Sequence, residues 1–440
     1  MQDTSNINNT ISFIGLGKLG LPLATIFAKN GMNVIGIDKN KKLIDTLNNG
    51  ELPFYETGLQ ENLNDSNENI KYTNDYDGIT DKSDVSIILV NTQIDKSYSS
   101  EYVVSAIKDL CDELKNSDKL YHLFILSSTV LPGEIENKLI PLVEKTTGRK
   151  LNKGFGFCYV PDIVKLGSVI QDFENPDVMI IGKSDDYSGK ITRELYQNVP
   201  INEPPIAEMS LSEAEVSKVA LNAYLVNKIS FANFLSNLCE EMGGVNVDNI
   251  TEAIGFHKPI SPYFLKGGLS FGGTCFPRDT WTFIELANKF GLDAKQIVAT
   301  NEINIQQDLR LYKFVKDSKK KSISILGLSF KPNSPVIVES PSIKLVENLL
   351  KDDKVVNVYD PLCLKEVKEK FGNKLNYFDS VEDCFKSGEL VVVALQYDEF
   401  KSINDDWKSF DNQIVLDCWR ILDENKFKKI DYKCLGKRKK

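Results

Sequence analysis

Histidine is almost absent from the 440-residue chain, which has only His122 and His257. Two histidines so far apart argue against a histidine zinc site, and they leave little material for a histidine general base. The eight cysteines include no Cys-x-x-Cys pair, so we interpret them as reduced thiols and expect no metal site. Chemistry in this protein is therefore expected from cysteine, lysine, acidic, amide and hydroxyl side chains.

The sequence also lacks an apolar run of membrane-spanning length and the layout of a secretory signal. Its net charge is -9, whereas a general nucleic-acid binder would be basic. The composition, 42% hydrophobic and 26% charged, is ordinary for a globular protein. We expect a cytoplasmic protein with no membrane or nucleic-acid partner, and the length predicts two or three domains.

Short apolar runs alternate with helix-like stretches over the first 200 residues, which indicates βαβ units and a mostly parallel sheet. Residues 208–240 then keep helical periodicity without proline or glycine, so we predict one long helix there. From about residue 321 the βα rhythm returns. The expected fold is α/β, with an N-terminal Rossmann domain (1–205), a central all-α domain (206–312) and a C-terminal Rossmann-like domain (313–440).

A glycine fingerprint follows the first apolar run. Gly15, Gly17 and Gly20 have G-x-G-x-x-G spacing, which allows a tight turn and a close backbone approach to a pyrophosphate at a helix N-terminus. Asp38 ends the next apolar run, where a carboxylate accepts hydrogen bonds from ribose hydroxyls and repels a 2′-phosphate. NAD is therefore favoured over NADP, although two lysines, Lys39 and Lys42, follow closely.

Three further segments give the chain a family resemblance. They are "FGGTCFPRD" (271–279), "AEVSKVALNAYLVNKISFANF" (214–234) and "GLSFKPNSPVIVESPS" (327–342). With the glycine fingerprint, they make the chain similar to the nucleotide-sugar 6-dehydrogenases, a family that includes UDP-glucose, UDP-N-acetylhexosamine and GDP-mannose dehydrogenases. The resemblance implies NAD-dependent four-electron oxidation of a primary alcohol to a carboxylate in polysaccharide biosynthesis. It also implies a homodimer formed through the long central helix.

The resemblance gives the reactive residues their roles. A lone cysteine is usually a small buried residue, but Cys275 matches the family nucleophile, whose thiolate traps an aldehyde as a thiohemiacetal. Asp279 would position or activate water. Lys218 and Asn222, spaced i and i+4 on one helix face, would stabilise oxyanions. Glu215 is interpreted as an ordinary surface or packing carboxylate. The expected catalytic residues are Cys275, Lys218, Asn222, Asp279, Thr129 and Asp162.

We also expect two sets of binding residues, one for the cofactor and one for the substrate. The cofactor set is Gly15, Gly17, Lys18, Leu19, Gly20, Asp38, Thr92 and Ser128. The substrate set implied by the resemblance is Asp162, Lys218, Asn222, Phe264, Leu265, Lys266, Phe271, Gly272 and Lys331. The N-terminal domain would then bind NAD, the central domain would carry the cysteine and the dimer surface, and the C-terminal domain would bind the nucleotide sugar.

The chain departs from the family pattern at four positions. Asp162 and Leu166 stand where the family usually has glutamates, and Pro259 and Val338 stand where it has arginines. The catalytic positions match better than those expected to set specificity. Two alternatives therefore remain: the same chemistry on an atypical nucleotide-linked alcohol, or a catalytically decayed NAD-binding scaffold.

Overall fold

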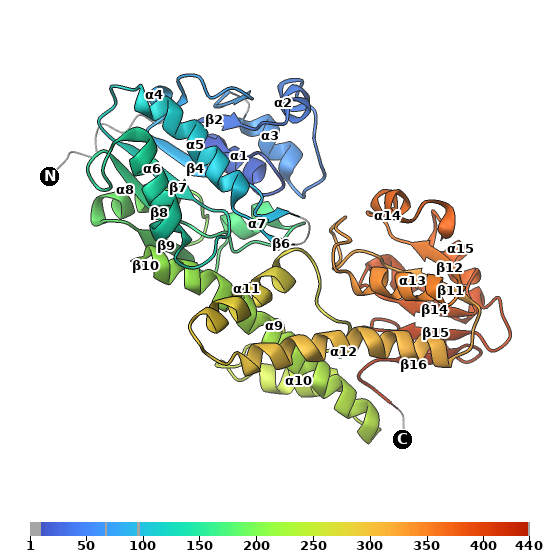
Figure 1. Ribbon diagram of the computed structural model, residues 1–440. Coiled ribbons are helices and arrows are strands. Elements are labelled where there is room, and N and C mark those ends of the chain that lie inside the picture. Colours follow the sequence, from blue (N-terminus) through green and yellow to red (C-terminus); the bar gives the residue numbers. More distant parts are fainter. Residues whose placement is uncertain (1–9, 67, 95–96, 439–440) are drawn as a thin grey trace. The chain divides into compact units, whose positions relative to one another are not determined.

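The structure is a computed structural model that describes residues 10–66, 68–94 and 97–438. The chain divides into two compact units, Met1–Val219 and Ala220–Lys440, and the boundary falls inside the long helix α9 (Leu211–Met242). Figure 1 shows the order of elements: a first α/β region, a group of helices and a second α/β region. The predicted α/β, helical, α/β sequence is confirmed.

In its described residues the first unit forms one eight-stranded sheet of order β10-β9-β8-β7-β4-β1-β2-β3. Every neighbouring pair is parallel except β8 and β9, which are antiparallel. The strands are β1 (Thr10–Ile14), β2 (Asn33–Ile37), β3 (Ile70–Thr73), β4 (Val85–Ile88), β7 (His122–Leu126), β8 (Phe155–Tyr159), β9 (Met179–Lys183) and β10 (Ile206–Ser210). A short antiparallel pair, β5 (Gln93–Ile94) and β6 (Ser97–Tyr98), lies outside this sheet.

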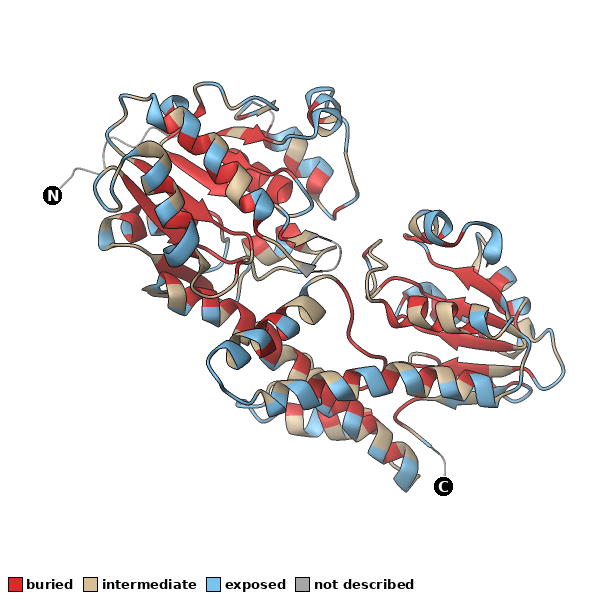
Figure 2. Cartoon of the chain, viewed as in Figure 1, coloured by how far each residue is buried: buried red, intermediate tan, exposed pale blue. Residues whose placement is uncertain are grey.

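Helices cover this sheet because its central strands are apolar on both faces, as parallel strands usually are. β7 and β8, for example, are buried at every position, and Figure 2 shows both sheets in the colour of buried residues. The helices are α1 (Gly20–Lys29), α2 (Lys41–Asn48), α3 (Leu59–Ser66), α4 (Ile79–Lys82), α5 (Glu101–Lys115), a π-helical turn (Ile135–Leu139), α6 (Ile140–Thr147), α7 (Val169–Glu174) and α8 (Asp186–Tyr196). The alternation of strands and helices expected over the first 200 residues is confirmed.

The second unit begins with the remainder of α9 and three further helices. These are α10 (Val247–Gly255), α11 (Cys275–Lys289) and α12 (Lys295–Asp317). The long helix predicted over 208–240 is confirmed within three residues at each end. Helix α11 begins at Cys275 itself, and Pro277 lies in its first turn, where proline is tolerated. None of the helices in the described residues is long and apolar enough to cross a membrane.

A fully parallel sheet of order β13-β12-β11-β14-β15-β16 follows in residues 322–434. Its strands are β11 (Ser322–Leu326), β12 (Val355–Tyr359), β13 (Asn376–Tyr377), β14 (Leu390–Val393), β15 (Ile414–Asp417) and β16 (Asp431–Cys434). Its helices are α13 (Pro341–Lys351), α14 (Leu364–Phe371), α15 (Val381–Lys386) and the 3-10 turns Gly372–Lys374, Asp398–Ser402, Asp405–Trp407 and Glu424–Lys426.

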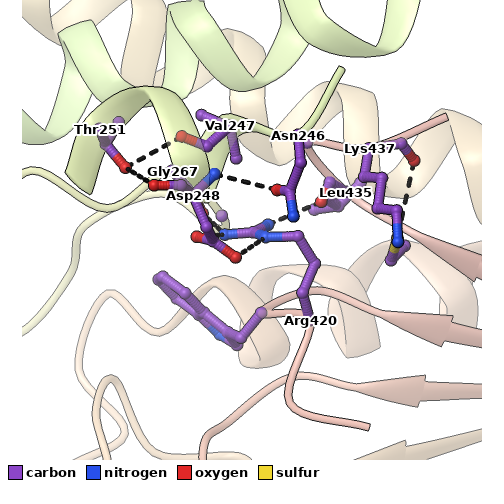
Figure 3. A network of polar contacts seen from close by, with 12 residues as sticks. Asn246, Val247, Asp248, Thr251, Gly267, Arg420, Leu435 and Lys437 are labelled. Carbon is purple, nitrogen blue, oxygen red and sulfur yellow. Dashed lines mark hydrogen bonds and ion pairs between the residues drawn. The ribbon is translucent and has the colours of Figure 1, made fainter. Parts of the chain in front are cut away.

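One buried arginine ties this sheet to the helices of the same unit (Figure 3). Arg420, three residues after β15, forms a bidentate ion pair with Asp248 of α10 at 2.7 and 2.8 Å. Its guanidinium also donates to the carbonyl oxygens of Leu435 and Gly267. The Arg420 side chain is only 5% exposed, so this geometry strongly favours one arrangement of strand end, helix and loop.

Candidate active site

The turn between β1 and α1 has the close contacts that its glycines predict. A Cβ at Gly15 would lie 2.3 Å from the carbonyl oxygen of Leu89, and one at Gly20 would lie 2.0 Å from that of Gly15. Gly15 also has φ of +98°, which favours glycine. A Cβ at Gly17 would meet no heavy atom within 4 Å. The exposed turn at Gly17, Lys18 and the half-buried Leu19 therefore leaves open space at the N-terminus of α1, where a pyrophosphate fits.

Asp38 lies directly after β2, at the same edge of the sheet as this turn. Its carboxylate accepts hydrogen bonds from the backbone nitrogens of Leu16 (2.9 Å) and Asn40 (2.8 Å), which fix its orientation. A carboxylate has lone pairs left for two ribose hydroxyls. Lys39 is ion-paired with Asp109 at 2.6 Å, so one of the two lysines that weakened the NAD assignment already has an anionic partner. These residues fit NAD.

Two further expected cofactor residues lie at the ends of β4 and β7. The Ser128 hydroxyl donates to the carbonyl oxygen of Val90 and accepts from its nitrogen, at 2.7 and 2.8 Å. Thr92 is buried two residues further along that chain segment. Parallel strands bring their carboxyl ends to one edge, and dinucleotides bind along that edge. The structure thus places Ser128 and Thr92 on the edge that carries Asp38.

Thr129 is half-buried, next to Ser128, in a loop that a carboxylate of α9 holds in place. Glu215 is fully buried and accepts from the backbone nitrogens of Gly133 (2.6 Å) and Ile135 (3.0 Å). Burial raises its pKa to about 7, against the effect of these two donors. Glu215 is therefore a packing carboxylate that caps the π-helical turn, so the packing interpretation is confirmed and the surface interpretation is wrong. Helix periodicity alone could not show this contact.

Lys218 lies one turn further along α9 and is 7% exposed. Its ammonium donates to the main-chain carbonyl of Asp162. The Asp162 side-chain oxygen Oδ2 is buried and has no hydrogen-bond partner among the residues that the structure describes. It lies beside a small cavity lined by Val160, Phe173 and Tyr196 among other residues. Burial raises the Asp162 pKa to about 7, and the charge of Lys218 partly opposes that rise. A carboxyl with such a pKa can accept and return a proton near neutrality.

Cys275 is the first residue of α11 and is exposed. Six of the other seven cysteines are buried and Cys434 is intermediate, all eight lying in the described residues. The N-terminus of a helix stabilises nearby negative charge. The Thr274 hydroxyl lies 3.6 Å from the Cys275 sulfur. Exposure and position suit a nucleophile and do not suit a packing residue.

One turn into α11, Asp279 is fully buried and has partners on both carboxylate oxygens. Oδ2 accepts from the Asn222 side-chain amide at 2.6 Å, and Oδ1 accepts from the Arg278 guanidinium at 2.7 Å. The Arg278 side chain is 11% exposed. The structure thus brings together Asn222, Asp279 and the helix start at Cys275. Asp279 is held as an ion-paired anchor, a geometry that fits positioning better than activation of water.

The expected substrate loop contains an aromatic cluster. Phe264 and Phe271 each pack edge-on against Phe276, with centroids 6.0 and 6.2 Å apart. Leu265 and Phe271 are buried, Phe264 is half-buried with φ of +61°, and Lys266 is exposed. The loop therefore combines a fixed apolar wall with one exposed lysine.

Gly272 packs closely against the backbone of Glu339. A Cβ at Gly272 would lie 2.2 Å from the carbonyl oxygen of Glu339, and Gly273 donates to the carbonyl oxygen of Val338 at 3.0 Å. Val338, which stands where the family has an arginine, thus contacts the loop before Cys275 through its backbone. Lys331, five residues after β11, lies 5.9 Å from the Phe330 ring centroid. It lies beyond the carboxyl end of a strand at which the sheet order changes direction, where ligands of α/β sheets bind.

The structure also shows where the remaining positions that depart from the family pattern and the two histidines lie. Leu166 packs against the core of the first unit, and Pro259 is exposed. His122 is buried in β7, where burial lowers its pKa to about 3, and its Nε2 lies 2.9 Å from the Ser86 hydroxyl. His257 is exposed. Within the part of the chain that the structure describes, no group of three or more His, Cys, Asp or Glu side chains could hold a metal ion.

Three family models of the UDP-glucose/GDP-mannose dehydrogenase family match the chain in order. The NAD binding domain matches residues 9–200, the central domain 212–306 and the UDP binding domain 324–424. The UDP-glucose 6-dehydrogenase of Haloferax volcanii is 31% identical over 421 residues, covering 94% of this chain and 97% of that protein. The UDP-glucose 6-dehydrogenase of Rickettsia conorii is 32% identical over 439 residues, covering 96% and 98%.

Solved structures agree with these matches. A UDP-glucose dehydrogenase from the archaeon Pyrobaculum islandicum superposes with a TM-score of 0.89 at 26% identity, covering 98% of this chain and 99% of that one. Domain order, fold and sequence therefore give the same answer: the chain belongs to the UDP-glucose/GDP-mannose dehydrogenase family, whose members are NAD-dependent oxidoreductases acting on nucleotide sugars.

Proposed function

We propose that this protein oxidises the C6 primary alcohol of a nucleotide sugar to a carboxylate through covalent adducts on Cys275. The observation that carries the proposal is the exposed Cys275 at the start of α11, one turn from the Asn222–Asp279 hydrogen bond. Residues Gly15, Gly17, Gly20 and Asp38 would hold NAD, which when bound accepts hydride from the carbon being oxidised. One alcohol, one water and two NAD⁺ yield one carboxylate, two NADH and three protons.

The chemistry of Cys275 explains why a cysteine is needed. Its sulfur adds to the aldehyde carbon, forming a C–S bond and a thiohemiacetal, so that no free aldehyde leaves. Loss of the second hydride converts this adduct to a thioester. Water then adds to the carbonyl carbon and the C–S bond breaks, which releases the carboxylate and restores the thiol. A hydroxyl would be a weaker nucleophile and a poorer leaving group.

The other proposed roles follow from position and charge. Lys218 and Asn222 lie one turn apart on α9 and supply N–H donors for oxyanions formed during these steps. Asp279 holds the Asn222 amide in a fixed orientation. Asp162, with its pKa raised to about 7, accepts and returns the proton of water during thioester hydrolysis, and Thr129 helps to hold that water.

Substrate binding is assigned to residues of the central and C-terminal domains. We propose that Phe264, Leu265, Phe271 and Gly272 form the apolar wall for the sugar and base. Lys266 and Lys331 pair with the diphosphate, since ammonium groups bind phosphate as point charges. This division corresponds to NAD-binding, catalytic and nucleotide-sugar-binding domains at 1–205, 206–312 and 313–440.

The proposal is tested by counting reduced cofactor. We expect two NADH per nucleotide sugar, read at 340 nm, when purified protein is offered NAD and UDP-, GDP-, CDP- or dTDP-linked hexoses one at a time. The UDP-linked sugars are expected to react best, as the named relatives suggest. NADP should support little turnover because Asp38 repels its 2′-phosphate. Binding of NAD with no reduction across the whole panel would refute the proposal and support a scaffold role.

A second candidate keeps the chemistry and changes the alcohol. Pro259 and Val338 replace expected arginines, so these positions favour a substrate with fewer anionic groups. The same panel separates the candidates. Ordinary turnover of UDP-glucose supports the first, whereas turnover confined to another nucleotide-linked primary alcohol supports the second.

We further propose that the chain forms a homodimer through α9. Beyond residue 220 this helix exposes a stripe of large apolar side chains, spaced by three, four or seven residues. They are Tyr224, Phe231, Phe234, Leu238 and Met242, exposed by 61, 48, 52, 43 and 63%. Solvent-exposed stripes of this kind usually mark an interface.

A charge placed in this stripe should separate the subunits. Phe234→Glu is expected to shift the mass measured by light scattering from twice 49.5 kDa to 49.5 kDa. Leu120→Glu, at a position 89% exposed in the first unit, is the matched control and should leave the mass unchanged. A Phe234→Glu protein that stays at the dimer mass would place the interface elsewhere.

A further inference from the structure

The backbone leading into Cys275 forms hydrogen bonds at five of the seven residues 267–273, although it is neither helix nor strand. Residues 267–273 connect the aromatic loop to the start of α11. Irregular backbone lacks the ladder partners that helices and strands provide, and buried N–H and C=O groups left without partners are costly. The partners here come instead from side chains on α9, α12 and the loop after β15.

Two asparagines supply most of these bonds. Asn304 of α12 accepts from the Phe271 nitrogen at 2.7 Å and donates to the Phe271 carbonyl at 3.0 Å, as a neighbouring strand would. Asn233 of α9 accepts from the Gly268 nitrogen at 2.8 Å and donates to the Leu269 carbonyl at 3.1 Å. Each amide thus satisfies one donor and one acceptor of the segment.

The remaining bonds hold the two ends. Gln307 of α12 donates to the Gly268 carbonyl at 2.6 Å, and Arg420 donates to the Gly267 carbonyl at 2.7 Å (Figure 3). At the other end the Gly273 nitrogen donates to the Val338 carbonyl at 3.0 Å. The segment is therefore fixed on both sides, by the helices and by the C-terminal sheet region of the same unit.

The amides are deeply buried, which makes their bonds hard to replace with water. Asn233, Asn304 and Gln307 are 0, 4 and 2% exposed. Removing one of them would leave buried backbone groups without that partner and loosen the segment. Motion of the segment would be passed directly to Cys275, two residues beyond Gly273. A nucleophile displaced by about 1 Å can lose about 10²-fold in rate.

We propose that Asn233, Asn304 and Gln307 are positioning residues that hold the 267–273 backbone so that the Cys275 sulfur meets the substrate carbon. The inference rests on the proposed function of Cys275. It assigns these three amides a positioning role through the segment they bind, and this role needs no contact of their own with the substrate.

Asn304 gives the sharpest test. Asn304→Ala and the nearly isosteric Asn304→Leu should both lower kcat by about 10- to 100-fold, with KM for NAD within about twofold of wild type. Hydrogen exchange at the Phe271 amide should accelerate at least tenfold in both. The alkylation rate of Cys275 by iodoacetamide, followed on its peptide by mass spectrometry, should change by threefold or more. Gln307→Met, which keeps volume without the donor, should behave similarly.

Matched variants separate positioning from general loss of structure. Asn301→Ala and Gln306→Ala change the same residue types on α12 at half-buried and exposed positions, and should leave all three measurements unchanged. Restoration of kcat by Asn304→Leu or Gln307→Met would show that volume alone matters and would overturn the inference. So would unchanged exchange and alkylation in Asn304→Ala. Exchange and alkylation need no turnover, so an inactive wild type would refute the proposed function separately.

Discussion

Replacement of Cys275 by alanine is expected to abolish carboxylate formation, lowering turnover by ~10³-fold or more, as removal of a catalytic nucleophile usually does. Without the sulfur, the aldehyde is not trapped and no thioester can form. Cys275→Ser should also fail at the second oxidation, because a hydroxyl is a poor nucleophile without an activating base. The rate and the NADH stoichiometry at 340 nm measure both effects. Intact-protein mass spectrometry should show substrate adducts on the wild type only.

Because Cys275 is exposed, its replacement should change activity without changing stability. Because the side chain is exposed, its removal leaves no buried cavity, and the midpoint of thermal unfolding should stay within about 1 °C of wild type. Cys434→Ser is the matched control, since Cys434 is the other cysteine with solvent access, and its activity should be kept. Full four-electron turnover by Cys275→Ala would show that the mechanism is wrong.

The fold was largely predictable because its strands are apolar runs with few alternatives. Runs such as the one in β7 are buried throughout, and the proline-free periodicity of α9 is long enough to be unambiguous. β3 and β10 were not predicted. "IKYT" and "IAEMS" are short, partly polar edge strands, and their hydrogen bonds to neighbouring strands hold them in the sheet.

The reactive residues were assigned from sequence because they stand in motifs that resemble those of the family. The resemblance assigns Cys275 and Asp279 in one motif, and Lys218 and Asn222 in another, where they are spaced i and i+4 on one helix. Their supporting contacts could not be named. Glu215, Asn233 and Asn304 bind backbone groups between 33 and 82 residues away. Such pairings depend on tertiary packing. In the local sequence, an asparagine or glutamate that binds a distant backbone group looks the same as one on an exposed helix face.

Removal of the Asp279 carboxylate is expected to be the most damaging change to the fold of the second unit. Asp279→Ala removes a carboxylate that the nearly buried Arg278 guanidinium contacts at 2.7 Å and the Asn222 amide contacts at 2.6 Å. Breaking a buried ion pair by removing one partner costs ~3–5 kcal/mol. The urea midpoint should fall accordingly, and turnover should be lost because Asn222 no longer has a fixed orientation.

Asp279→Asn separates the two effects. It keeps the shape and one acceptor oxygen but loses the charge, so the destabilisation should be smaller than in Asp279→Ala while turnover stays at least ~10²-fold reduced. Glu285→Ala removes an exposed carboxylate from the same helix and should change neither property. If Asp279→Ala unfolds at the wild-type urea concentration, the buried pair does not stabilise this unit. If Asp279→Asn turns over normally, the charge is not needed to position Asn222, and the role assigned to Asp279 is wrong.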